Sequence, residues 1–454
     1  MLLLAWSASA QKKNVLLFLV DDLGYFDIAH HGSKLYETPN IDQLAKDGMD
    51  FTNAYVAHPR CVPSRFGLQS GKFPARAQVP GGKEKLDTKS LTIGGAFQQR
   101  GYETFFAGKW HLGHDESEWP QNKGYDVNVA GCSAGAPKSY FFPYNVSKNK
   151  KVSGKHKIIV GLENGAEGEY LTDRLTDETI GFLKQDHQKP FFAILAHYGV
   201  HTPLQAPKEL VKKYRQKLGA MTFEGPDYIE KDGQTKMHQD HAVYAAMIES
   251  VDQSLGRLVA TLKEQGIYEN TIIVFTSDHG GLSNRGIGNK RDLATSNLPL
   301  RAGKGHSYEG GIKVPLIMAN VGKAGVSEQV TINTDLYPTL LDFCELKLFP
   351  EYHLDGQSIK AEVLKGKKKD RTLFWHSPKG RPKSTGDTNC SVIRVGDYKL
   401  MDFYEEGRLE LYDLSKDPQE GNNLVERKSK VAKAMHQQLK DWRKEIKAFG
   451  APKS

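Results

Sequence analysis

Cysteine is scarce in this sequence, and long apolar runs are missing. Four cysteines, at positions 61, 132, 344 and 390, stand among 454 residues. This is too few for a disulfide scaffold of such length, and if one of them is used chemically, the other three allow one disulfide at most. No segment approaches the roughly 18–20 continuous apolar residues that a membrane-spanning helix needs. The sequence therefore predicts neither a disulfide-rich fold nor a transmembrane segment.

Signals of nucleic-acid binding are also absent. The chain has no zinc-finger spacing, no RNA-binding motif and no helix with arginines along one face. Its formal net charge is nevertheless +8, with basic clusters at residues 148–157 and 365–371. Such clusters are most often solvated surface, although a basic surface also speeds the encounter with an anionic polymer. We therefore expect no nucleic-acid partner.

The remaining composition is that of an ordinary globular enzyme, 39% hydrophobic and 26% charged. A chain of this length suits two or three domains. Residues 1–10 resemble the end of a signal peptide, because a short apolar run precedes small residues in an A-x-A pattern, although the basic start is missing. We expect export to the periplasm or the medium, with a disordered N-terminus as the alternative.

Apolar runs alternate with amphipathic helical patterns from residue 14 to about residue 361. The runs 15–20, 103–107, 191–196 and 271–277 have the character of buried strands, and each is followed by polar residues. Helical patterns cover 39–46, 171–185 and 241–265. This alternation predicts a mixed, mostly parallel α/β sheet flanked by helices, which we assign to a catalytic domain at 11–370.

The pattern changes near residue 371. Four short strands are predicted at 372–376, 391–395, 398–403 and 409–414, with turns between them, followed by an amphipathic helix at about 428–447. Residues 371–454 therefore form a predicted C-terminal subdomain, a small antiparallel sheet with one helix.

Acidic residues follow two of the predicted strands directly. Asp21 and Asp22 come after the first run, and Asp278 and His279 after the last. Ligands bind at the carboxyl ends of parallel strands, where these side chains would meet. Three crowded carboxylates repel one another unless a cation lies between them, and Ca²⁺ and Mg²⁺ prefer oxygen ligands. The pattern predicts a metal site, with turn or helix caps as the alternative.

Basic and imidazole side chains follow the other strands. Lys109 and His111 come after 103–107, and His201 after 191–196, while Lys304 lies in a glycine-rich loop. Lysines can neutralise an anion, and imidazoles can transfer protons near neutral pH. A single histidine of this kind is more often a packed or surface residue, so the argument depends on their convergence.

The segment CVPSR at 61–65, with Gly71 ten positions after Cys61, is the most specific motif. An isolated cysteine is usually a small buried hydrophobe. Arg65 would lie on the same side as Cys61 if a short helix began near Ser64. The start of such a helix also directs backbone N–H groups toward an anion.

Together these motifs resemble the formylglycine-dependent type I sulfatases, the arylsulfatase A-like branch of the alkaline phosphatase superfamily. The chain is most similar to bacterial enzymes of polysaccharide degradation, and the resemblance covers nearly its whole length. The motifs occur in the family's order: DDLG at 21–24, CVPSR at 61–65, GKWHLG at 108–113, SDHGG at 277–281, GK at 303–304 with YEGG at 308–311, and LYDLSKDP at 411–418.

The resemblance implies an alkaline phosphatase-like fold and a set of roles. Asp21, Asp22, Asp278 and His279 would bind Ca²⁺, or Mg²⁺ in its place, together with the modified Cys61. A formylglycine-generating maturation enzyme would oxidise Cys61 to formylglycine (3-oxoalanine). The hydrate of this aldehyde would attack the sulfur of a sulfated oligo- or polysaccharide and form a covalent sulfo-enzyme.

The remaining implied roles concern charge and protons. Arg65 would hold the nucleophile. His201, assisted by Lys304, would protonate the leaving sugar, and His111, supported by Lys109, would remove the proton that allows sulfate to depart.

Two departures from the family pattern leave alternatives open. His279 stands where many members have Asn, and an imidazole is a softer ligand than an amide oxygen. The Asp-His-Gly form also occurs in phosphatase-like relatives, so a formylglycine-dependent phosphodiester or phosphonate monoester hydrolase is the second reading. A non-catalytic sulfated-glycan binding protein with unmodified Cys61 is the third. The motif also ends in QSG at 69–71 rather than the commoner LTG, and we expect modification to survive this change.

Candidate contacts to the sugar are less specific. Tyr140, Phe141, Phe142 and Tyr144 open an insertion at 139–168 that would either stack against a glycan or anchor a solvated loop. Four residues near motif loops could hydrogen-bond sugar hydroxyls: His114, Arg301, His306 and His376.

Overall fold

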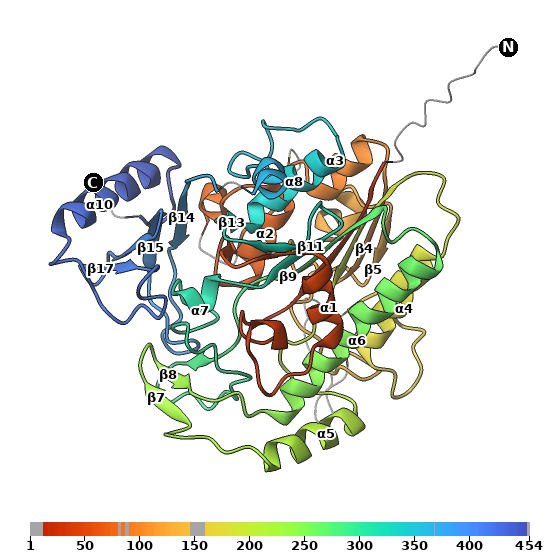
Figure 1. Ribbon diagram of the computed structural model, residues 1–454, viewed down its shortest axis with the longest axis horizontal. Helices are drawn as coiled ribbons and strands as arrows, with labels where there is room; N and C mark the ends of the chain where they lie inside the picture. The colour runs from red at the N-terminus through yellow and green to blue at the C-terminus, as the bar shows by residue number, and fades with distance from the viewer. Residues whose placement is uncertain (1–11, 80–82, 87–89, 146–158, 367, 452–454) are drawn as a thin grey trace.

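An eight-stranded mixed sheet lies at the centre of the molecule (Figure 1). The computed structural model describes residues 12–79, 83–86, 90–145, 159–366 and 368–451. The strand order is β12-β2-β11-β9-β1-β6-β4-β5. The strands are β1 (Asn14–Val20), β2 (Met49–Phe51), β4 (Glu103–Gly108), β5 (Val127–Val129), β6 (Phe191–Ala196), β9 (Thr271–Ser277), β11 (Leu316–Ala319) and β12 (Gly325–Ser327).

The middle of this sheet is parallel. Strand β1 pairs in parallel with β6 and β9, and β4 pairs in parallel with β5 and β6. Strand β11 runs antiparallel to both β9 and β2. The predicted mixed, mostly parallel sheet is therefore confirmed, and the four strands that were expected to carry site residues are neighbours in the order β9-β1-β6-β4.

Helices cover both faces of the sheet. One face packs against α1 (Pro39–Asp47), α4 (Leu171–Leu183) and α6 (Ala242–Glu264), with α5 (Lys208–Gly219) lying against α6. The other packs against α2 (Cys61–Ser70), α3 (Ile93–Gln99), α8 (Leu336–Phe343) and α9 (Lys360–Lys365). Along β1, Leu16 and Phe18 face the first layer, whereas Val15 and Leu17 face the second.

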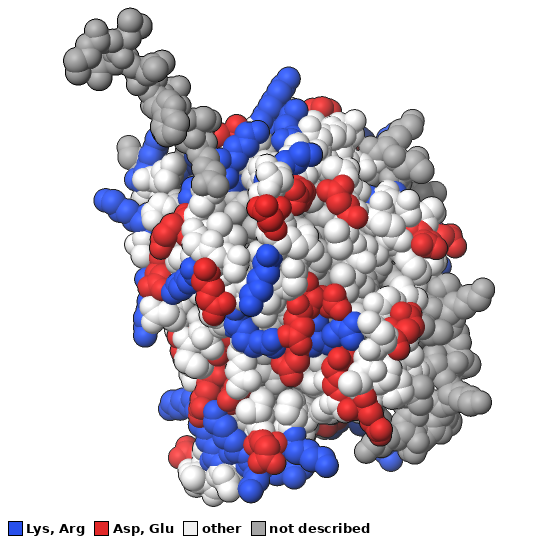
Figure 2. Space-filling model, turned by 90° about the vertical axis from the view of Figure 1, so that its right-hand side faces the viewer, with Lys and Arg blue, Asp and Glu red and all other residues white. Residues whose placement is uncertain are grey.

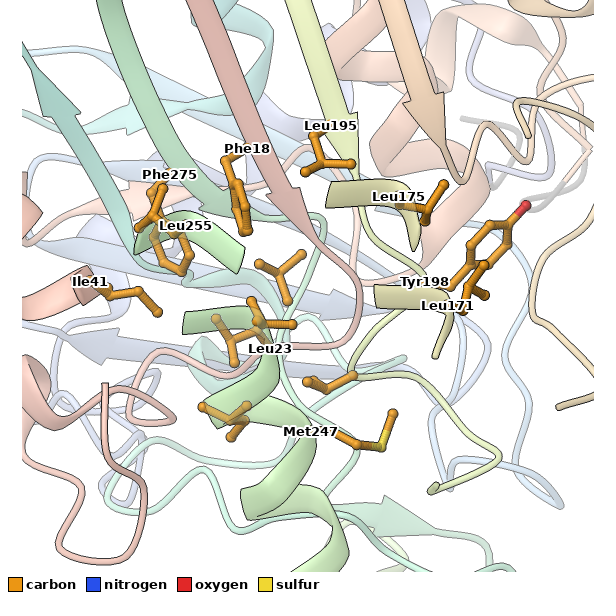
Figure 3. Close-up of a cluster of buried hydrophobic side chains, with 14 of the residues drawn as sticks. Phe18, Leu23, Ile41, Leu171, Leu175, Leu195, Tyr198, Met247, Leu255 and Phe275 are labelled. Carbon is orange, nitrogen blue, oxygen red and sulfur yellow. The ribbon is translucent and has the colours of Figure 1, made fainter. Parts of the chain in front are cut away.

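The first layer is shown in Figure 3. Phe18 stacks on Phe275 with ring centroids 5.8 Å apart, and Leu195 and Leu255 are fully buried beside them. Each such side chain contributes about 1.5–3 kcal/mol by leaving water. Strands buried on both faces are continuously apolar, which is why these runs could be recognised in the sequence.

Helix α2 begins earlier than the sequence analysis predicted. We expected its start near Ser64, but the helix begins at Cys61, with Arg60 as the N-cap. The Ser64 amide donates to the Arg60 carbonyl at 3.0 Å, which closes the first turn. Pro63 is tolerated because first-turn residues need no intrahelical N–H donor. Cys61 is therefore the first helical residue rather than a loop residue.

The C-terminal region forms a separate antiparallel sheet beside the central one (Figure 1). Its order is β14-β15-β16-β17, and α10 (Ser429–Glu445) packs on it. The strands are β14 (Thr372–Ser377), β15 (Cys390–Val395), β16 (Tyr398–Phe403) and β17 (Arg408–Asp413). The small antiparallel sheet with one helix is thus confirmed.

Shorter elements complete the described chain. They are β3 (Ala54–Tyr55), β7 (Tyr228–Glu230), β8 (Gln234–Lys236), β10 (Asn284–Arg285), β13 (Thr331–Ile332), α7 (Glu309–Ile312), and the 3-10 turns η1 (Ala29–His31), η2 (Pro74–Ala77), η3 (Glu116–Glu118), η4 (Pro120–Asn122) and η6 (Asn333–Asp335).

The face drawn in Figure 2 mixes basic and acidic side chains. Residues 1–10 and the basic cluster at 148–157 lie outside the described residues. Within the described part of the chain, no helix combines the length and apolar character needed to cross a bilayer. All four cysteines are described, and each is a buried free thiol.

Buried ion pairs attach the C-terminal sheet to the rest of the molecule. The Lys399 ammonium lies 2.9 Å from a Glu309 carboxylate oxygen and 2.8 Å from one of Glu420, and all three side chains are buried. The Trp375 indole N–H donates to the Val56 carbonyl at 2.7 Å. The C-terminal sheet therefore packs against Val56, in the segment that precedes α2, and against Glu309 of α7.

We expect Lys399→Met to lower the free energy of unfolding by roughly 3–5 kcal/mol, because two buried carboxylates would lose their cation. Lys416→Met is the matched control, since the Lys416 side chain is 83% exposed and lies 3.9 Å from Asp413. This exposed pair should contribute between 0 and about 1 kcal/mol. Denaturant unfolding of both variants measures the difference, and equal losses would contradict the assignment.

Candidate active site

The carboxyl ends of β9, β1, β6 and β4 bring the predicted polar residues to one edge of the sheet. Asp278 and His279 follow β9, and Asp21 and Asp22 follow β1. His201 lies in the loop after β6, while Lys109 and His111 follow β4. The N-terminus of α2 adds Cys61 and Arg65. Residues far apart in the sequence thus meet because parallel strands end together.

Each buried carboxylate has its own cation. The Lys109 ammonium donates to Asp21 Oδ2 at 2.5 Å, and the Arg65 Nε donates to Asp278 Oδ2 at 2.9 Å. Lys304 Nζ donates to both oxygens of Asp22, at 2.7 and 2.8 Å. Taking a charge out of water is costly unless it is paired, so these pairs allow the cluster to stay buried.

The negative charge of Asp21 is the least stabilised among the three carboxylates. Burial raises the pKa of Asp21 well above its usual value, more than the Lys109 ammonium lowers it. Burial also favours a raised pKa for Asp22, but Lys304, His201 and His279 outweigh it and hold this pKa below the usual value. Among the described residues, Asp21 Oδ1 has no hydrogen-bond partner, and its nearest cation is Arg65 Nη2 at 3.5 Å. This oxygen is available to a further cation.

The donor set fits a divalent cation. Asp21, Asp22, Cys61 and His279 each offer a ligand atom, and these atoms lie within 4.8 Å of one another. Asp278 Oδ1 stands 3.6 Å from His279 Nε2 at the border of this group. Asp21 Oδ1, which has no hydrogen-bond partner among the described residues, points to the same conclusion.

His279 is oriented so that its Nε2 faces the acidic groups. Its Nδ1 lies 3.0 Å from the Gly280 carbonyl and donates to it, which leaves Nε2 free to act as a ligand. Nε2 lies 3.2 Å from Asp22 Oδ1. Burial lowers the pKa of His279, but Asp278, Cys61 and Asp22 raise it to about 9. The surroundings thus favour a positive charge at Nε2, which a proton or a metal ion can supply.

Cys61 lies within this electrostatic field. Its Sγ is 3.1 Å from His279 Nε2, at the first position of α2. Burial raises the pKa of the thiol, but Lys109, Lys304 and His279 together bring it well below its usual value. The site therefore stabilises negative charge on the side chain at position 61, which is the requirement for an activated nucleophile.

Two imidazoles border the site in neutral form. Burial lowers the pKa of His111 to about 4, and burial with the Lys304 charge lowers that of His201 to about 3. His201 Nδ1 donates to the Thr202 carbonyl at 2.6 Å, and its Nε2 lies 3.8 Å from Asp22 Oδ2. Both rings are uncharged near pH 7 and can accept a proton.

A cavity of about 1030 Å³ adjoins these imidazoles. His111, His114 and His201 line it, together with three lysines that the sequence analysis did not identify, Lys83, Lys85 and Lys138. The lysines come from segments with no regular periodicity, so no pattern marked them. Arg291 was also missed; its Nη2 lies 3.3 Å from Thr202 Oγ1, next to His201.

Three of the four predicted sugar contacts make internal bonds instead. Arg301 binds both oxygens of Asp232, at 2.7 and 2.8 Å, and lies over the Tyr308 ring. His306 Nε2 hydrogen-bonds the Thr385 carbonyl at 2.8 Å.

His376 bridges Ser391 Oγ and the Phe449 carbonyl. These bonds hold the side chains of Arg301, His306 and His376 within the protein, and their contact with a sugar stays a prediction. His114, in contrast, is exposed on the cavity wall.

The aromatic residues before the insertion have a supporting position. Tyr140 is fully buried, and its hydroxyl donates to the carbonyls of Tyr198 at 2.6 Å and His201 at 2.8 Å. The Tyr144 hydroxyl donates to Glu169. Tyr140 therefore holds the loop that carries His201. The middle of the insertion, residues 146–158, lies outside the described residues.

Taken together, the edge of the sheet holds three buried carboxylates, three cations, two neutral imidazoles and an ionisable thiol beside a cavity with further lysines. Such a set suits a hydrolase that binds a tetrahedral anion with the help of a metal ion. The fold and the site together define an enzyme of the alkaline phosphatase type.

Comparison with known proteins identifies the family. The sulfatase family profile matches residues 13–345, and the profile of the N-sulphoglucosamine sulphohydrolase C-terminal region matches residues 303–445. A sulfatase of Formosa agariphila is 30% identical, covering 95% of this chain and 89% of its own. The chain therefore belongs to the sulfatase family, and it is a sulfuric ester hydrolase.

Other relatives agree with this. The N-acetylgalactosamine-6-sulfatase of Mus musculus is 27% identical, covering 87% of this chain and 72% of its own. The crystal structure of Ps i-CgsB in complex with k-i-k-neocarrahexaose superimposes with a TM-score of 0.77 at 30% identity, covering 95% of this chain and 93% of that one.

The contact between two loops at the site provides a test of its geometry. A Cβ on Gly280 would stand 1.9 Å from the Gly310 carbonyl oxygen, so Gly280→Ala must displace the turn that carries Asp278 and His279. We expect kcat to fall by about 10²-fold, the typical effect of a misplacement of roughly 1 Å.

Gly181→Ala in α4 is the control for this prediction, because a Cβ there meets no atom within 4 Å. It should leave kcat unchanged and stabilise the helix by roughly 0.5–1 kcal/mol. Turnover and thermal unfolding of both variants are the measurements, and full activity in Gly280→Ala would contradict the predicted displacement.

Proposed function

We propose that this sulfatase removes an ester sulfate from a sulfated carbohydrate after Cys61 has been converted to formylglycine. The observation that carries the proposal is the position of Cys61. Its Sγ lies at the start of α2, 3.1 Å from His279 Nε2, where Lys109 and Lys304 favour negative charge on the side chain. A nucleophile at this place faces the carboxylate cluster and lies beside His111, which lines the cavity.

Asp21, Asp22, Asp278 and His279 would hold a divalent cation, Ca²⁺ or alternatively Mg²⁺, together with the modified side chain at position 61. Bound there, the cation would withdraw charge from the sulfate oxygens, and the hydrated aldehyde would supply the attacking hydroxyl. Asp21 Oδ1, which has no hydrogen-bond partner among the described residues, and His279 Nε2, which lies 3.2 Å from Asp22 Oδ1, support this assignment.

The chain's own cations would orient the sulfate group. Arg65 bridges Asp278 and the Lys109 carbonyl, with Nη1 donating to the latter at 2.6 Å. Arg65 is thereby fixed next to position 61. Lys109 and Lys304, each held by a carboxylate, would neutralise oxygens of the bound ester without having to reorient.

Proton transfer would fall to the two imidazoles. His111, neutral beside Cys61, is suited to accept a proton from the group at position 61. His201 lines the cavity, with its Nε2 3.8 Å from Asp22 Oδ2, and a bound sulfate ester would add a negative charge near it. That charge raises the pKa of His201, so the ring could take up a proton and donate it to the leaving sugar oxygen.

The cavity supports an anionic carbohydrate as substrate. Lys83, Lys85 and Lys138 line it beyond the imidazoles, and they would attract a glycan with more than one anionic group. One relative is an N-acetylgalactosamine-6-sulfatase, and another has been crystallised with a neocarrahexaose. A substrate of this class would meet the enzyme outside the cytoplasm, in agreement with the export that we expect.

The first prediction from this proposal concerns the conversion of Cys61 to formylglycine. When the protein is produced with a formylglycine-generating enzyme, the peptide that contains Cys61 should lose about 18 Da, the result of losing H₂S and gaining one oxygen. Intact-mass analysis measures this, and release of free sulfate from a panel of sulfated oligosaccharides measures activity. Cys61→Ala should show neither the mass change nor turnover.

The same material separates the competing functions. Matched aryl sulfate and aryl phosphate esters compare the two chemistries, and faster turnover of the phosphate ester would favour the phosphodiesterase or phosphonate hydrolase reading. An unshifted Cys61 peptide with no turnover of either ester would favour a glycan-binding protein.

The second prediction from this proposal concerns His201 as the proton donor to the leaving sugar. His201→Ala should lower kcat on a carbohydrate sulfate by roughly 10²–10⁴-fold, because the sugar alkoxide needs a proton to leave. An aryl sulfate with an acidic phenol should lose much less, since its phenolate is a stable leaving group. His114→Ala, on the same cavity wall, should show no such dependence on the leaving group. Equal losses on both esters would exclude His201 as the donor.

A further inference from the structure

A second group of metal-binding side chains lies outside the active site. His30 and His31 belong to the turn η1, and Asp50 lies in the central-sheet strand β2. One ligand atom from each of the three residues falls within 4.8 Å of the others. None of them takes part in the reaction proposed above, so their convergence needs another explanation.

The distances in this group are those between ligands of one metal ion. His30 Nε2 lies 3.2 Å from Asp50 Oδ2, and His31 Nε2 lies 3.1 and 3.2 Å from the two Asp50 oxygens. In a tetrahedral zinc site with bonds of about 2.0–2.2 Å, neighbouring ligand atoms stand roughly 3.3–3.5 Å apart. An ion between the three side chains would therefore require only a small adjustment.

The hydrogen bonding of His31 determines which nitrogen faces the carboxylate. Its Nδ1 lies 2.9 Å from the Tyr25 carbonyl, which can only accept, so Nδ1 carries a proton. In a neutral ring, Nε2 then directs its lone pair at the Asp50 carboxylate, which is repulsive. A cation at Nε2, either a second proton or a metal ion, removes the repulsion. Metal-binding histidines usually have this arrangement of carbonyl, ring and ligand.

The surroundings hold the group in place but leave one side open. The side chains of His31 and Asp50 are 4% and 5% exposed, whereas that of His30 is 27% exposed. Tyr25 stacks on the His31 ring at 4.1 Å between centroids. An ion can thus enter from the side of His30 and meet two ligands that are already fixed.

Two further charged groups lie around the cluster. Asp42 Oδ1 accepts a hydrogen bond from the His30 backbone amide at 3.0 Å. The Lys313 ammonium lies over the Tyr25 ring, 4.8 Å from its centroid, and it interacts electrostatically with Asp50. The Asp42 carboxylate favours a bound cation, and the Lys313 ammonium opposes it. The affinity for a metal ion therefore depends on His30, His31 and Asp50.

We infer that His30, His31 and Asp50 bind a transition-metal ion such as Zn²⁺, with water completing its coordination. Two imidazoles and one carboxylate suit Zn²⁺ and its neighbours, whereas Ca²⁺ prefers oxygen ligands. The ion would tie η1, which follows the Asp21–Asp22 turn along the chain, to strand β2. It would stabilise the fold next to the active site without taking part in hydrolysis.

Calorimetric titration with Zn²⁺ in an excess of Ca²⁺ tests the inference, since Ca²⁺ occupies oxygen-rich sites first. The unaltered protein should bind one more equivalent of Zn²⁺ than His30→Ala, and Asp50→Asn should lose the same equivalent. Each variant removes a direct ligand, so its affinity should fall by at least the roughly 10–100-fold that loss of an outer partner causes. Zn²⁺ should also raise Tm in the unaltered protein more than in either variant.

His187→Ala is the matched control. His187 likewise lies between a carbonyl and a carboxylate, 2.9 Å from the Phe182 oxygen and 2.6 Å from Glu103. Among the described residues, however, it belongs to no group of three metal-ligating side chains. This variant should retain the extra equivalent. Equal Zn²⁺ stoichiometry in the unaltered protein and His30→Ala, or loss of the equivalent in His187→Ala, would overturn the inference. Because the readouts are binding and Tm, they do not depend on turnover.

Discussion

Charge buried at the ends of parallel strands needs an opposite charge in contact, and this requirement organises the active site. Asp21, Asp22 and Asp278 lie under the helices and loops of one sheet edge, where water cannot solvate them. Lys109, Lys304 and Arg65 each neutralise one of them from a different part of the chain. In the function proposed above, the same cations would bind the anionic substrate, so the groups that make burial possible would also supply the binding site.

Much of the fold could be predicted because the central strands are apolar on both faces. The run at 271–277 coincides with β9, and the run at 191–196 coincides with β6. The meeting of their polar ends at one edge of the sheet was predicted from the rule that ligands bind at the carboxyl ends of parallel strands. The start of α2 was predicted three residues too late, although Pro63 is compatible with the first turn of a helix that begins at Cys61.

The site was predictable where motifs carry its residues and not elsewhere. Cys61, Asp21 and Lys304 belong to segments with a recognisable order, and the structure brings them together. Arg301 lies close to Lys304 in sequence, yet its guanidinium binds Asp232, because the two neighbouring side chains leave the loop in different directions. Lys83 and Lys138 reach the cavity from irregular segments. Direction and loop path depend on tertiary packing, which local sequence does not encode.

The orientation of the His279 imidazole is set by a backbone carbonyl as well as by the carboxylates around it. The Gly280 carbonyl accepts a hydrogen bond from Nδ1 at 3.0 Å, and this bond turns Nε2 toward Asp22. At position 279 the family pattern more often has an amide oxygen. His31 is oriented in the same way by the Tyr25 carbonyl at 2.9 Å. In both places a carbonyl fixes the tautomer, so a nitrogen lone pair faces a carboxylate and a cation becomes favourable between them. In the metal site proposed above, His279 would therefore take the place of an oxygen ligand with its Nε2 directed at the acidic groups.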